Sequence, residues 1–557
     1  MYINKTLTFI GTGIVGFYSQ AIYAQGSQEN PNIVLILLDD VGYSDFGCYG
    51  SEIETPNIDR LAENGIRLRN FYNMARSAPT RGSLMTGLYP HQEGQGALGR
   101  VPGYPAYQGY PNNENAFIPE VLRSAGYFSI MTGKWHMGFP QGVTPIKRGF
   151  DRSLNAPTGG FYFSTDRDKP AANKKNNNKK NNENSGKKKL YRNDVRIPFN
   201  DPSLPKDWYS SYLWTKCGLD FADEAMADGK PFFWYLAFNG AHFPLQAPAE
   251  TIAKYRGKYK KGWDAIRDAR YKKQIELGLF SKDEKLTPRN PKIKAWDELT
   301  PEEQDRQDLI MSIYAATVEE IDRNIGLLMK HLEEKEQFDN TLILLLSDNG
   351  GNAEGGLYGK CLGKNPGTVG SNIWLGTAWA DVANTPYYLY KHHGHEGGCN
   401  TPLIVSYPNG IDKKLNGTID KVNYGHITDI MATQVELTGA EYPEVRDGHK
   451  VQPMEGTSLL PMLEGKKINR TKPIIVEHEG NKMLRYGDWK IVQEYTETEW
   501  MLYNIKKDPT EMCNLAKENP KKLKELVSLY NSEAKRIGVE PEIKFKVGEW
   551  YTPVDKH

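Results

Sequence analysis

Three short, unbroken runs of apolar residues recur along the chain, and they predict its fold class. They cover residues 33–38, 232–237 and 341–346. Runs of this length without polar interruption are typical of strands that are buried on both faces, as in a parallel sheet. A longer segment at 310–333 has the spacing of apolar residues expected for a helix. The alternation predicts an α/β fold with a large, mostly parallel sheet sandwiched by helices.

The pattern changes after residue 465. Four short segments of strand-like composition follow one another with turns between them, at 474–478, 482–485, 489–493 and 500–504. A helical segment at 520–537 follows them. The length of 557 residues also exceeds the usual size of one domain. We therefore expect a large unit over residues 25–465 and a smaller C-terminal unit over residues 466–557.

The first 24 residues have the pattern of a secretory signal peptide. Lys5 is their only cation, the apolar centre covers residues 7–17, and the small residue Ala24 ends the segment. A membrane anchor is the alternative, but glycines interrupt this stretch. No other run approaches about 18 uninterrupted apolar residues, the length that a membrane span needs. We expect export to the periplasm or the medium, without stable membrane insertion.

Residues 76–87 place a small polar residue at the start of an apparent helix. Pro79 suits the first helical turn, because a proline there loses no hydrogen bond. Ser77 then lies beside free backbone N–H groups at the positive end of the helix dipole, and Arg81 follows one turn later. These features favour the binding of an anion. An ordinary junction between a loop and a helix is the alternative interpretation.

Acidic residues follow two of the predicted buried strands. Asp39 and Asp40 come after the first run, while Asp348 and Asn349 come shortly after the third. The carboxyl ends of parallel strands meet at one edge of a sheet, so these side chains could meet there. Adjacent carboxylates repel one another unless a cation lies between them, and an all-oxygen set favours calcium or magnesium over zinc. The alternative is that some of these residues cap helices.

With these residues the chain resembles the type I, formylglycine-dependent sulfatases of the alkaline phosphatase superfamily. Within that family it resembles the serine-type, arylsulfatase-like branch. The signature of that family is Cys or Ser, any residue, Pro, any residue, Arg, and then a stretch that ends in Thr-Gly. The matching segments lie in the family's order at 77–87, 133–138, 239–244, 347–351 and 391–398, with a branch motif at 378–381. One such motif is weak, but five in order are specific. The resemblance implies an alkaline phosphatase-like catalytic domain and a C-terminal antiparallel sheet with a packed helix.

The resemblance also implies roles for individual residues. A maturation enzyme would oxidise Ser77 to 3-oxoalanine (formylglycine), whose hydrate provides the nucleophile. One Ca²⁺ ion would be bound by Asp39, Asp40, Ser77, Asp348 and Asn349. Arg81 and Lys134 would orient the hydrate, Lys391 would bind the sulfate group, His136 would assist sulfate release, and His242 would protonate the leaving alcohol.

The implied activity is hydrolysis of sulfate monoesters, with a sulfated carbohydrate as the expected substrate. One alternative is a phosphomonoesterase or phosphodiesterase of the same superfamily, which would need histidine as a zinc ligand where this chain has Asn349. Another is a silent protein that binds sulfated glycans. Most family members in aerobic organisms carry cysteine at the position of Ser77. A natural serine-type enzyme and a cysteine replaced by serine both agree with the sequence.

Four further features complete the expectations. The net charge of +1 gives no reason to expect nucleic acid as a partner. The Lys- and Asn-rich insertion at 165–190 is expected to be mobile, either as a solvated loop or as a basic lip for sulfated glycans. Among the histidines after Lys391, His395 is expected to face the sulfate pocket. Five cysteines allow two disulfides at most.

Overall fold

The structure is a computed structural model, and it describes residues 30–166, 188–495 and 497–545. The predicted signal peptide and most of the Lys- and Asn-rich insertion lie outside these ranges. Within them, no helix has both the length and the apolar character needed to cross a membrane.

The core of the molecule is a mixed sheet whose central strands run parallel. β1 (Asn32–Leu38) lies between β8 (Phe232–Ala237) and β9 (Thr341–Ser347). Beyond β8 the parallel order continues through β4 (Phe128–Lys134) and β5 (Arg152–Ala156). The sheet order is β13-β2-β12-β9-β1-β8-β4-β5-β6-β7. The three apolar runs of the sequence are therefore neighbouring central strands.

The outer strands introduce antiparallel pairings. β12 (Leu403–Ser406) pairs antiparallel with both β9 and β2 (Gly65–Leu68), and β13 (Thr418–Asp420) forms the edge beyond β2. At the other edge, β6 (Leu190–Arg192) and β7 (Val195–Ile197) are antiparallel. The sheet is thus mostly parallel at its centre, where the predicted strands lie, and mixed towards its edges.

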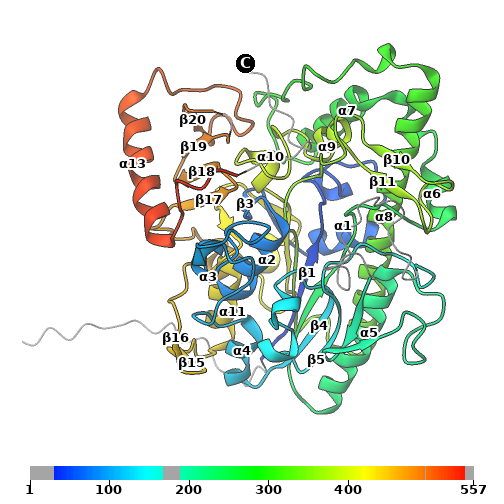
Figure 1. Cartoon of the computed structure of the whole chain (residues 1–557), viewed down its shortest axis with the longest axis vertical. Coiled ribbons are helices and arrows are strands. Elements are labelled where there is room, and N and C mark those ends of the chain that lie inside the picture. Colours follow the sequence, from blue (N-terminus) through cyan, green and yellow to red (C-terminus); the bar gives the residue numbers. More distant parts are fainter. Residues whose placement is uncertain (1–29, 167–187, 496, 546–557) are drawn as a thin grey trace, which may run out of the picture. The chain divides into compact units, whose positions relative to one another are not determined.

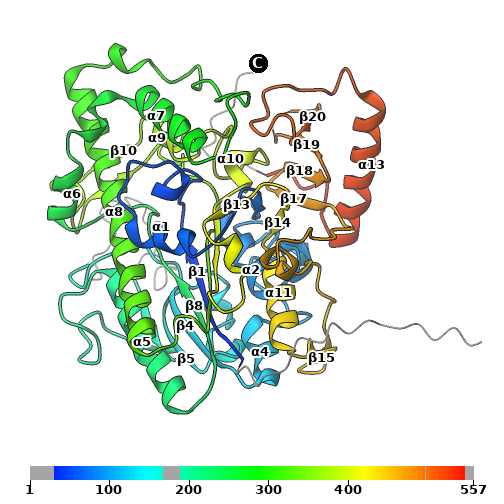
Figure 2. The same ribbon diagram turned by 180° about the vertical axis from the view of Figure 1, so that it is seen from behind.

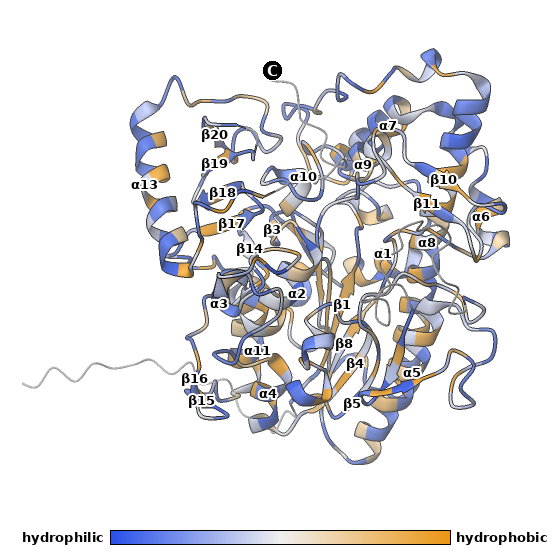
Figure 3. Ribbon diagram, viewed as in Figure 1, coloured by the Kyte–Doolittle hydropathy of each residue, from blue (hydrophilic) through white to orange (hydrophobic). Residues whose placement is uncertain are grey.

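Alternate residues of β1 point to opposite faces of the sheet, and each face is covered. Val34, Ile36 and Leu38 join one apolar core with α5 (Ser210–Ala227) and α8 (Pro301–Glu334). Ile33, Leu35 and Leu37 join a second core with α2 (Ser77–Thr86), α4 (Ile118–Leu122) and α11 (Asp429–Thr438). Figure 1 and the reverse view in Figure 2 show α5 and α8 on one side of the sheet and the second group of helices on the other. Figure 3 shows the apolar colour concentrated on the central strands. The predicted helix–sheet–helix sandwich is confirmed.

The C-terminal region forms the expected small antiparallel sheet. Its strands are β17 (Ile474–His478), β18 (Asn481–Tyr486), β19 (Trp489–Gln493) and β20 (Met501–Asn504), paired in that order. Helix α13 (Pro520–Ile537) packs against this sheet and buries Leu526, Tyr530 and Ala534. These side chains belong to the same apolar core as the second face of the large sheet.

The remaining elements are short and connect the layers. The helices are α1 (Pro56–Glu63), α3 (Pro90–Glu93), α6 (Ala249–Tyr255), α7 (Trp263–Glu276), α9 (Thr377–Ala383), α10 (Glu396–Cys399) and α12 (Leu460–Leu463). Paired short strands are β3 (Phe71–Tyr72) with β14 (Gly425–His426), β10 (Lys360–Leu362) with β11 (Asn372–Trp374), and β15 (Val445–Arg446) with β16 (His449–Lys450).

One predicted boundary differs clearly from the structure. Helix α8 begins at Pro301, whereas the apolar spacing predicts a start at residue 310. The first turns carry mainly charged and polar residues, so the apolar pattern does not reveal them. A capping box does: the Thr300 side chain accepts from the backbone N–H of Glu303, and the Glu303 carboxylate accepts from the N–H of Thr300.

The contact between α5 and β8 gives a test of the packing. A Cβ atom at Gly218 would lie 1.9 Å from Cζ2 of Trp234, whose indole N–H donates to Thr132 Oγ1 at 2.8 Å. We expect Gly218→Ala to lower the free energy of unfolding by about 1–3 kcal/mol, because the added methyl overpacks this contact. Alanine is a better helix former than glycine, so helix propensity alone predicts a higher free energy of unfolding for the variant. Urea unfolding measures the change, with Asp220→Ala on the exposed face of α5 as the control. A variant as stable as wild type or more stable contradicts the packing argument.

Candidate active site

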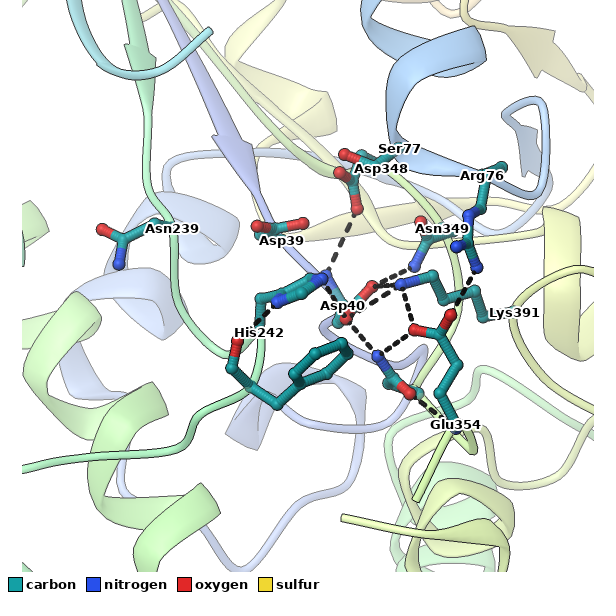
Figure 4. A network of polar contacts seen from close by, with 12 residues as sticks. Asp39, Asp40, Arg76, Ser77, Asn239, His242, Asp348, Asn349, Glu354 and Lys391 are labelled. Atoms are coloured by element: carbon teal, nitrogen blue, oxygen red, sulfur yellow. Dashed lines mark hydrogen bonds and ion pairs between the residues drawn. The ribbon is translucent and has the colours of Figure 1, made fainter. Parts of the chain in front are cut away.

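Parallel strands bring the predicted site residues to one edge of the sheet. Leu38 at the end of β1 is in register with Ser347 at the end of β9, so the residues that follow each strand are neighbours. Lys134 is the last residue of β4, and His242 lies in the loop after β8. The amino end of α2, with Ser77, lies at the same edge. Figure 4 shows side chains from the segments after β1, β8 and β9 gathered with Arg76, Ser77 and Lys391.

The Ser77 hydroxyl lies between an arginine and a histidine. Arg81, one turn further along α2, donates from Nε to Ser77 Oγ at 2.9 Å. His136 Nδ1 lies 3.3 Å from the same oxygen. Both Ser77 and Arg81 are almost fully buried. The predicted proximity of Arg81 to Ser77 follows from their spacing of one helical turn, whereas the position of His136 depends on the sheet.

Arg81 connects this hydroxyl to the carboxylates, and Lys134 binds one of them. Arg81 donates from Nη2 to Asp348 Oδ2 at 3.0 Å and lies 3.7 Å from Asp39 Oδ1. The Lys134 ammonium donates to Asp39 Oδ2 at 2.6 Å. Burial lowers the pKa of Lys134, and the negative charge of Asp39 opposes that shift.

Asp40 is the centre of the second half of the network. Its Oδ1 accepts from Asn349 Nδ2 at 2.7 Å and lies 2.8 Å from the Lys391 ammonium. His242 Nε2 lies 3.7 Å from Asp40 Oδ2. The backbone N–H of Asp40 donates to Asp348 Oδ1 at 3.2 Å, which links the two halves. All ten residues that the sequence marks as site residues are thus connected.

The donor set fits a hard cation. Asp39, Asp40, Asp348 and Asn349 are fully buried, yet Asp39 Oδ1 and Asn349 Oδ1 accept no hydrogen bond. A cation between these two oxygens would satisfy both of them. Burial and the charge of Asp39 raise the pKa of Asp348 to about 6, as expected for carboxylates crowded together without an ion between them. These residues are suited to Ca²⁺ on the chemistry of their oxygens.

The two histidines of the site are biased towards their neutral forms. Burial, with the charges of Lys134 and Arg81, lowers the pKa of His136 far below its usual value. Burial also lowers the pKa of His242 to about 4, against the opposing effect of Asp40. His242 Nδ1 donates to the Phe243 carbonyl at 2.7 Å. Nε2 is therefore the atom of His242 that can exchange a proton inside the site.

Backbone strain is concentrated around this network. Asp40, Ala75, His136 and His392 have φ angles of 64°, 56°, 58° and 84°. A non-glycine residue in this region costs on the order of 1–3 kcal/mol, so the surrounding contacts must hold it there. One such contact is the hydrogen bond from the His392 N–H to the Ala75 carbonyl at 2.9 Å. This hydrogen bond joins the loop of Lys391 to the segment that leads into Ser77.

The structure adds three residues that sequence reasoning did not identify. Glu354 lies 2.8 Å from Arg76 Nη1 and 3.1 Å from the Lys391 ammonium. Asn352 donates to Asp40 Oδ2 at 2.5 Å and to Glu354 Oε2 at 2.9 Å. Only their closeness to Asn349, Ser77 or Lys391 in the sequence could have drawn attention to them. Loop conformation, which the sequence does not reveal, brings them together.

The expectation for His395 is wrong. Its Nδ1 lies 3.0 Å from Glu511 Oε2, so it points towards the C-terminal region. His393 likewise contacts Glu494, at 2.6 Å. His392 is the member of this group that reaches the site, where its Nε2 contacts Arg76 and lies 3.4 Å from Glu354 Oε1. Consecutive loop residues point in different directions, which no periodic pattern predicts.

All five cysteines, which lie within the described ranges, are free thiols.

Comparison with known proteins finds relatives over most of the chain. A profile of the sulfatase family matches residues 31–440, and a profile described as the C-terminal part of N-sulphoglucosamine sulphohydrolase matches residues 387–536. An uncharacterised sulfatase of Schizosaccharomyces pombe is 34% identical over 547 residues, which cover 92% of this chain and 94% of the relative. Arylsulfatase of Klebsiella aerogenes is 33% identical over 446 residues, covering 78% of this chain and 92% of the relative.

A solved structure shares the whole architecture. The crystal structure of Ps i-CgsB in complex with k-i-k-neocarrahexaose superimposes with a TM-score of 0.66 and 26% identity, and it covers 93% of this chain and 95% of that one. The family profile spans most of the chain, and the two relatives align over most of their own lengths. Together with the fold and the buried site around Ser77, these matches favour a sulfuric ester hydrolase over the phosphate-ester and silent-binding alternatives. The chain belongs to the sulfatase family.

Proposed function

We propose that this protein hydrolyses O-sulfate monoesters of carbohydrates, with Ser77 matured to formylglycine and one Ca²⁺ ion at the adjacent carboxylates. In the overall reaction R–O–SO₃⁻ and water give R–OH, sulfate and a proton. The observation that carries the proposal is that Arg81 binds the Ser77 hydroxyl and, at the same time, a buried cluster of carboxylates and cations. A measurement of inorganic sulfate released from sulfated oligosaccharides tests it, with the matching phosphate esters as the comparison.

The charges of the site support an anionic substrate. Its cations and carboxylates are equal in number, namely Arg76, Arg81, Lys134 and Lys391 against Asp39, Asp40, Asp348 and Glu354. The site is therefore neutral without an ion and carries an excess of about two positive charges once a divalent cation is bound. Preorganised positive charge of this kind stabilises the oxygens of a sulfate ester and of its transition state.

Each group has a defined task in this proposal. Asp39, Asp40, Ser77, Asp348 and Asn349 would hold the ion, which supplies Lewis-acid stabilisation of negative charge. Formylglycine supplies a nucleophilic hydroxyl through its hydrate. Arg81 and His136 contact the reacting atoms of residue 77, and Lys134 neutralises Asp39. Lys391 would bind the sulfate oxygens.

In this proposal His242 would protonate the leaving alcohol. Its Nδ1 proton is held by the Phe243 carbonyl, so Nε2 is the atom that can deliver a proton to the departing oxygen. The lowered pKa leaves His242 mostly neutral in the free site, so general-acid catalysis requires its protonated form, which gives up a proton readily. The positive charge of that form would be balanced by Asp40.

A carbohydrate as the alcohol is supported by the relatives. The profile that matches residues 387–536 is named for N-sulphoglucosamine sulphohydrolase, and the solved relative holds k-i-k-neocarrahexaose. Export by a signal peptide and a maturation enzyme acting on Ser77 belong to the same proposal.

Oxidation of Ser77 is directly measurable. We expect the tryptic peptide that begins at Ser77 to weigh about 2 Da less than its unmodified mass, because formylglycine formation removes two hydrogens. Mass spectrometry of protein from its native maturation background tests this. Ser83, on the same buried helix, is the internal control and should be unmodified. A Ser77 peptide that is wholly unmodified contradicts the formylglycine mechanism.

Metal removal should affect both stability and activity. A chelator removes a ligand that binds only the folded site, so we expect a lower melting temperature and loss of sulfate release, both restored by Ca²⁺. At a concentration of 100 times its Kd, a ligand stabilises the folded state by about 2.7 kcal/mol. Differential scanning calorimetry with and without Ca²⁺, and with Mg²⁺ for comparison, measures the effect. If neither property responds, the proposed cation site is wrong.

The role of His242 predicts a dependence on the leaving group. We expect His242→Gln to lower kcat for a sugar sulfate by about 10²–10⁴-fold, since the alkoxide leaves poorly without a proton. With p-nitrophenyl sulfate, whose phenolate leaves readily, the loss should be much smaller. Steady-state rates on the two substrates test this. His331→Gln, which alters a histidine on α8 paired with Asp223, is the control. Equal losses on both substrates would rule out a general-acid role.

A further inference from the structure

Glu354 is a nearly buried carboxylate whose two oxygens each bind a different cation. Its side chain is 8% exposed, Oε1 lies 2.8 Å from Arg76 Nη1, and Oε2 lies 3.1 Å from the Lys391 ammonium. Burial would raise the pKa of Glu354, but the positive charges of Lys391 and Arg76 outweigh this and lower it. The carboxylate is therefore ionised. Figure 4 shows Glu354 beside Lys391, on the side of Asp40 away from Asp39.

The carboxylate is held rigidly. Asn352 Nδ2 donates to Glu354 Oε2 at 2.9 Å, and Asn352 Oδ1 accepts from the Glu354 backbone N–H at 2.7 Å. The neighbouring Ala353 packs against Ala380 of α9 and against Leu389. The loop of Lys391 is tied to the same segment, because its backbone N–H donates to the Gly351 carbonyl at 3.2 Å.

Lys391 has two carboxylate partners, and they differ in what else they must do. Its ammonium lies 2.8 Å from Asp40 Oδ1 and 3.1 Å from Glu354 Oε2. Asp40 belongs to the oxygen set that fits a divalent cation, so a bound cation would compete with Lys391 for it. Glu354 does not belong to that set, so it stays available to bind the Lys391 ammonium. A flexible lysine loses rotamer entropy when it is fixed, so a rigid partner that binds it before the substrate arrives reduces that cost.

We propose that Glu354 is a positioning residue that holds the Lys391 ammonium in place for the sulfate group and keeps the Arg76 guanidinium beside it. The proposal rests on the function proposed above. Glu354 acts through Lys391 and does not touch the reacting atoms, so its removal should weaken substrate binding more than the chemical step.

The test is Glu354→Gln, which keeps the shape of the side chain and removes its charge. We expect KM for a sulfated oligosaccharide to rise about 10- to 100-fold, the usual effect of losing a residue that orients a ligand-binding group. The value of kcat should change much less, because Lys391 binds sulfate in both the ground state and the transition state. The mass of the Ser77 peptide and the calcium content should equal those of the wild type.

The chain offers a closely matched control in Glu455. Its side chain is 3% exposed, and like Glu354 it joins a lysine, an arginine and a side-chain amide. These partners are Lys472, Arg536 and Gln92. Glu455→Gln removes an equivalent buried charge away from the site, so it should lower stability without changing KM or kcat.

A double-mutant cycle decides whether Glu354 acts through Lys391. In a Lys391→Ala background, Glu354→Gln should cause no further rise in KM, because the group that it positions is already absent. Additive effects overturn the proposal, and so does a KM for Glu354→Gln that matches wild type.

Glu354→Asp, which keeps the charge but withdraws it by one methylene, is the second variant if the first does not fold. Its KM should rise less than that of the Lys391→Ala variant, and a KM equal to wild type again overturns the proposal. If wild type releases no sulfate from any ester, the proposed function itself fails, which is a different result.

Discussion

Three carboxylates, Asp39, Asp40 and Asp348, lie together where water has almost no access, and the rest of the site is arranged around their mutual repulsion. In a buried environment each uncompensated charge is costly, so every carboxylate must have cationic or N–H partners within a few ångströms. Lys134 neutralises Asp39, Arg81 neutralises Asp348, and Lys391 neutralises Asp40. Asp39 Oδ1 and Asn349 Oδ1 remain without a hydrogen bond, and the proposed cation would satisfy both. A site with this demand for positive charge is suited to anionic esters.

The need of buried carboxylates for cationic partners also explains how distant segments are held in place. Arg81 reaches both the Ser77 hydroxyl and Asp348, so it joins the start of α2 to the end of β9. Glu354 joins the loop after β9 to Arg76 before α2 and to the loop of Lys391. Each ion pair is therefore also a structural connection between two loops. The left-handed backbone at Asp40, Ala75 and His392 persists because these connections hold it.

Sequence patterns predicted the fold well where one physical signal dominates. The runs of apolar residues at β1, β8 and β9 correspond to central strands because a strand that is covered on both faces has no polar position. Pro79 and the spacing from Ser77 to Arg81 predicted the start of α2 because helix geometry is local. The start of α8 was missed because its first turns are polar, and only the capping box at Thr300 marks them. The resemblance to sulfatases supplied residues, such as His136 and Lys391, that no pattern of spacing identifies.

The sequence by itself determined the class of fold, the carboxylates that follow two buried strands, and the position of Ser77 at a helix start, because periodicity, strand length and helix geometry are properties of short segments. Only the tertiary structure decided which side chains of the loops meet. It directed His392 towards the site and His395 towards Glu511, and it placed Glu354 between Arg76 and Lys391. Those choices depend on loop conformations that long-range packing and the cancellation of buried charge stabilise. No local pattern of residues encodes them.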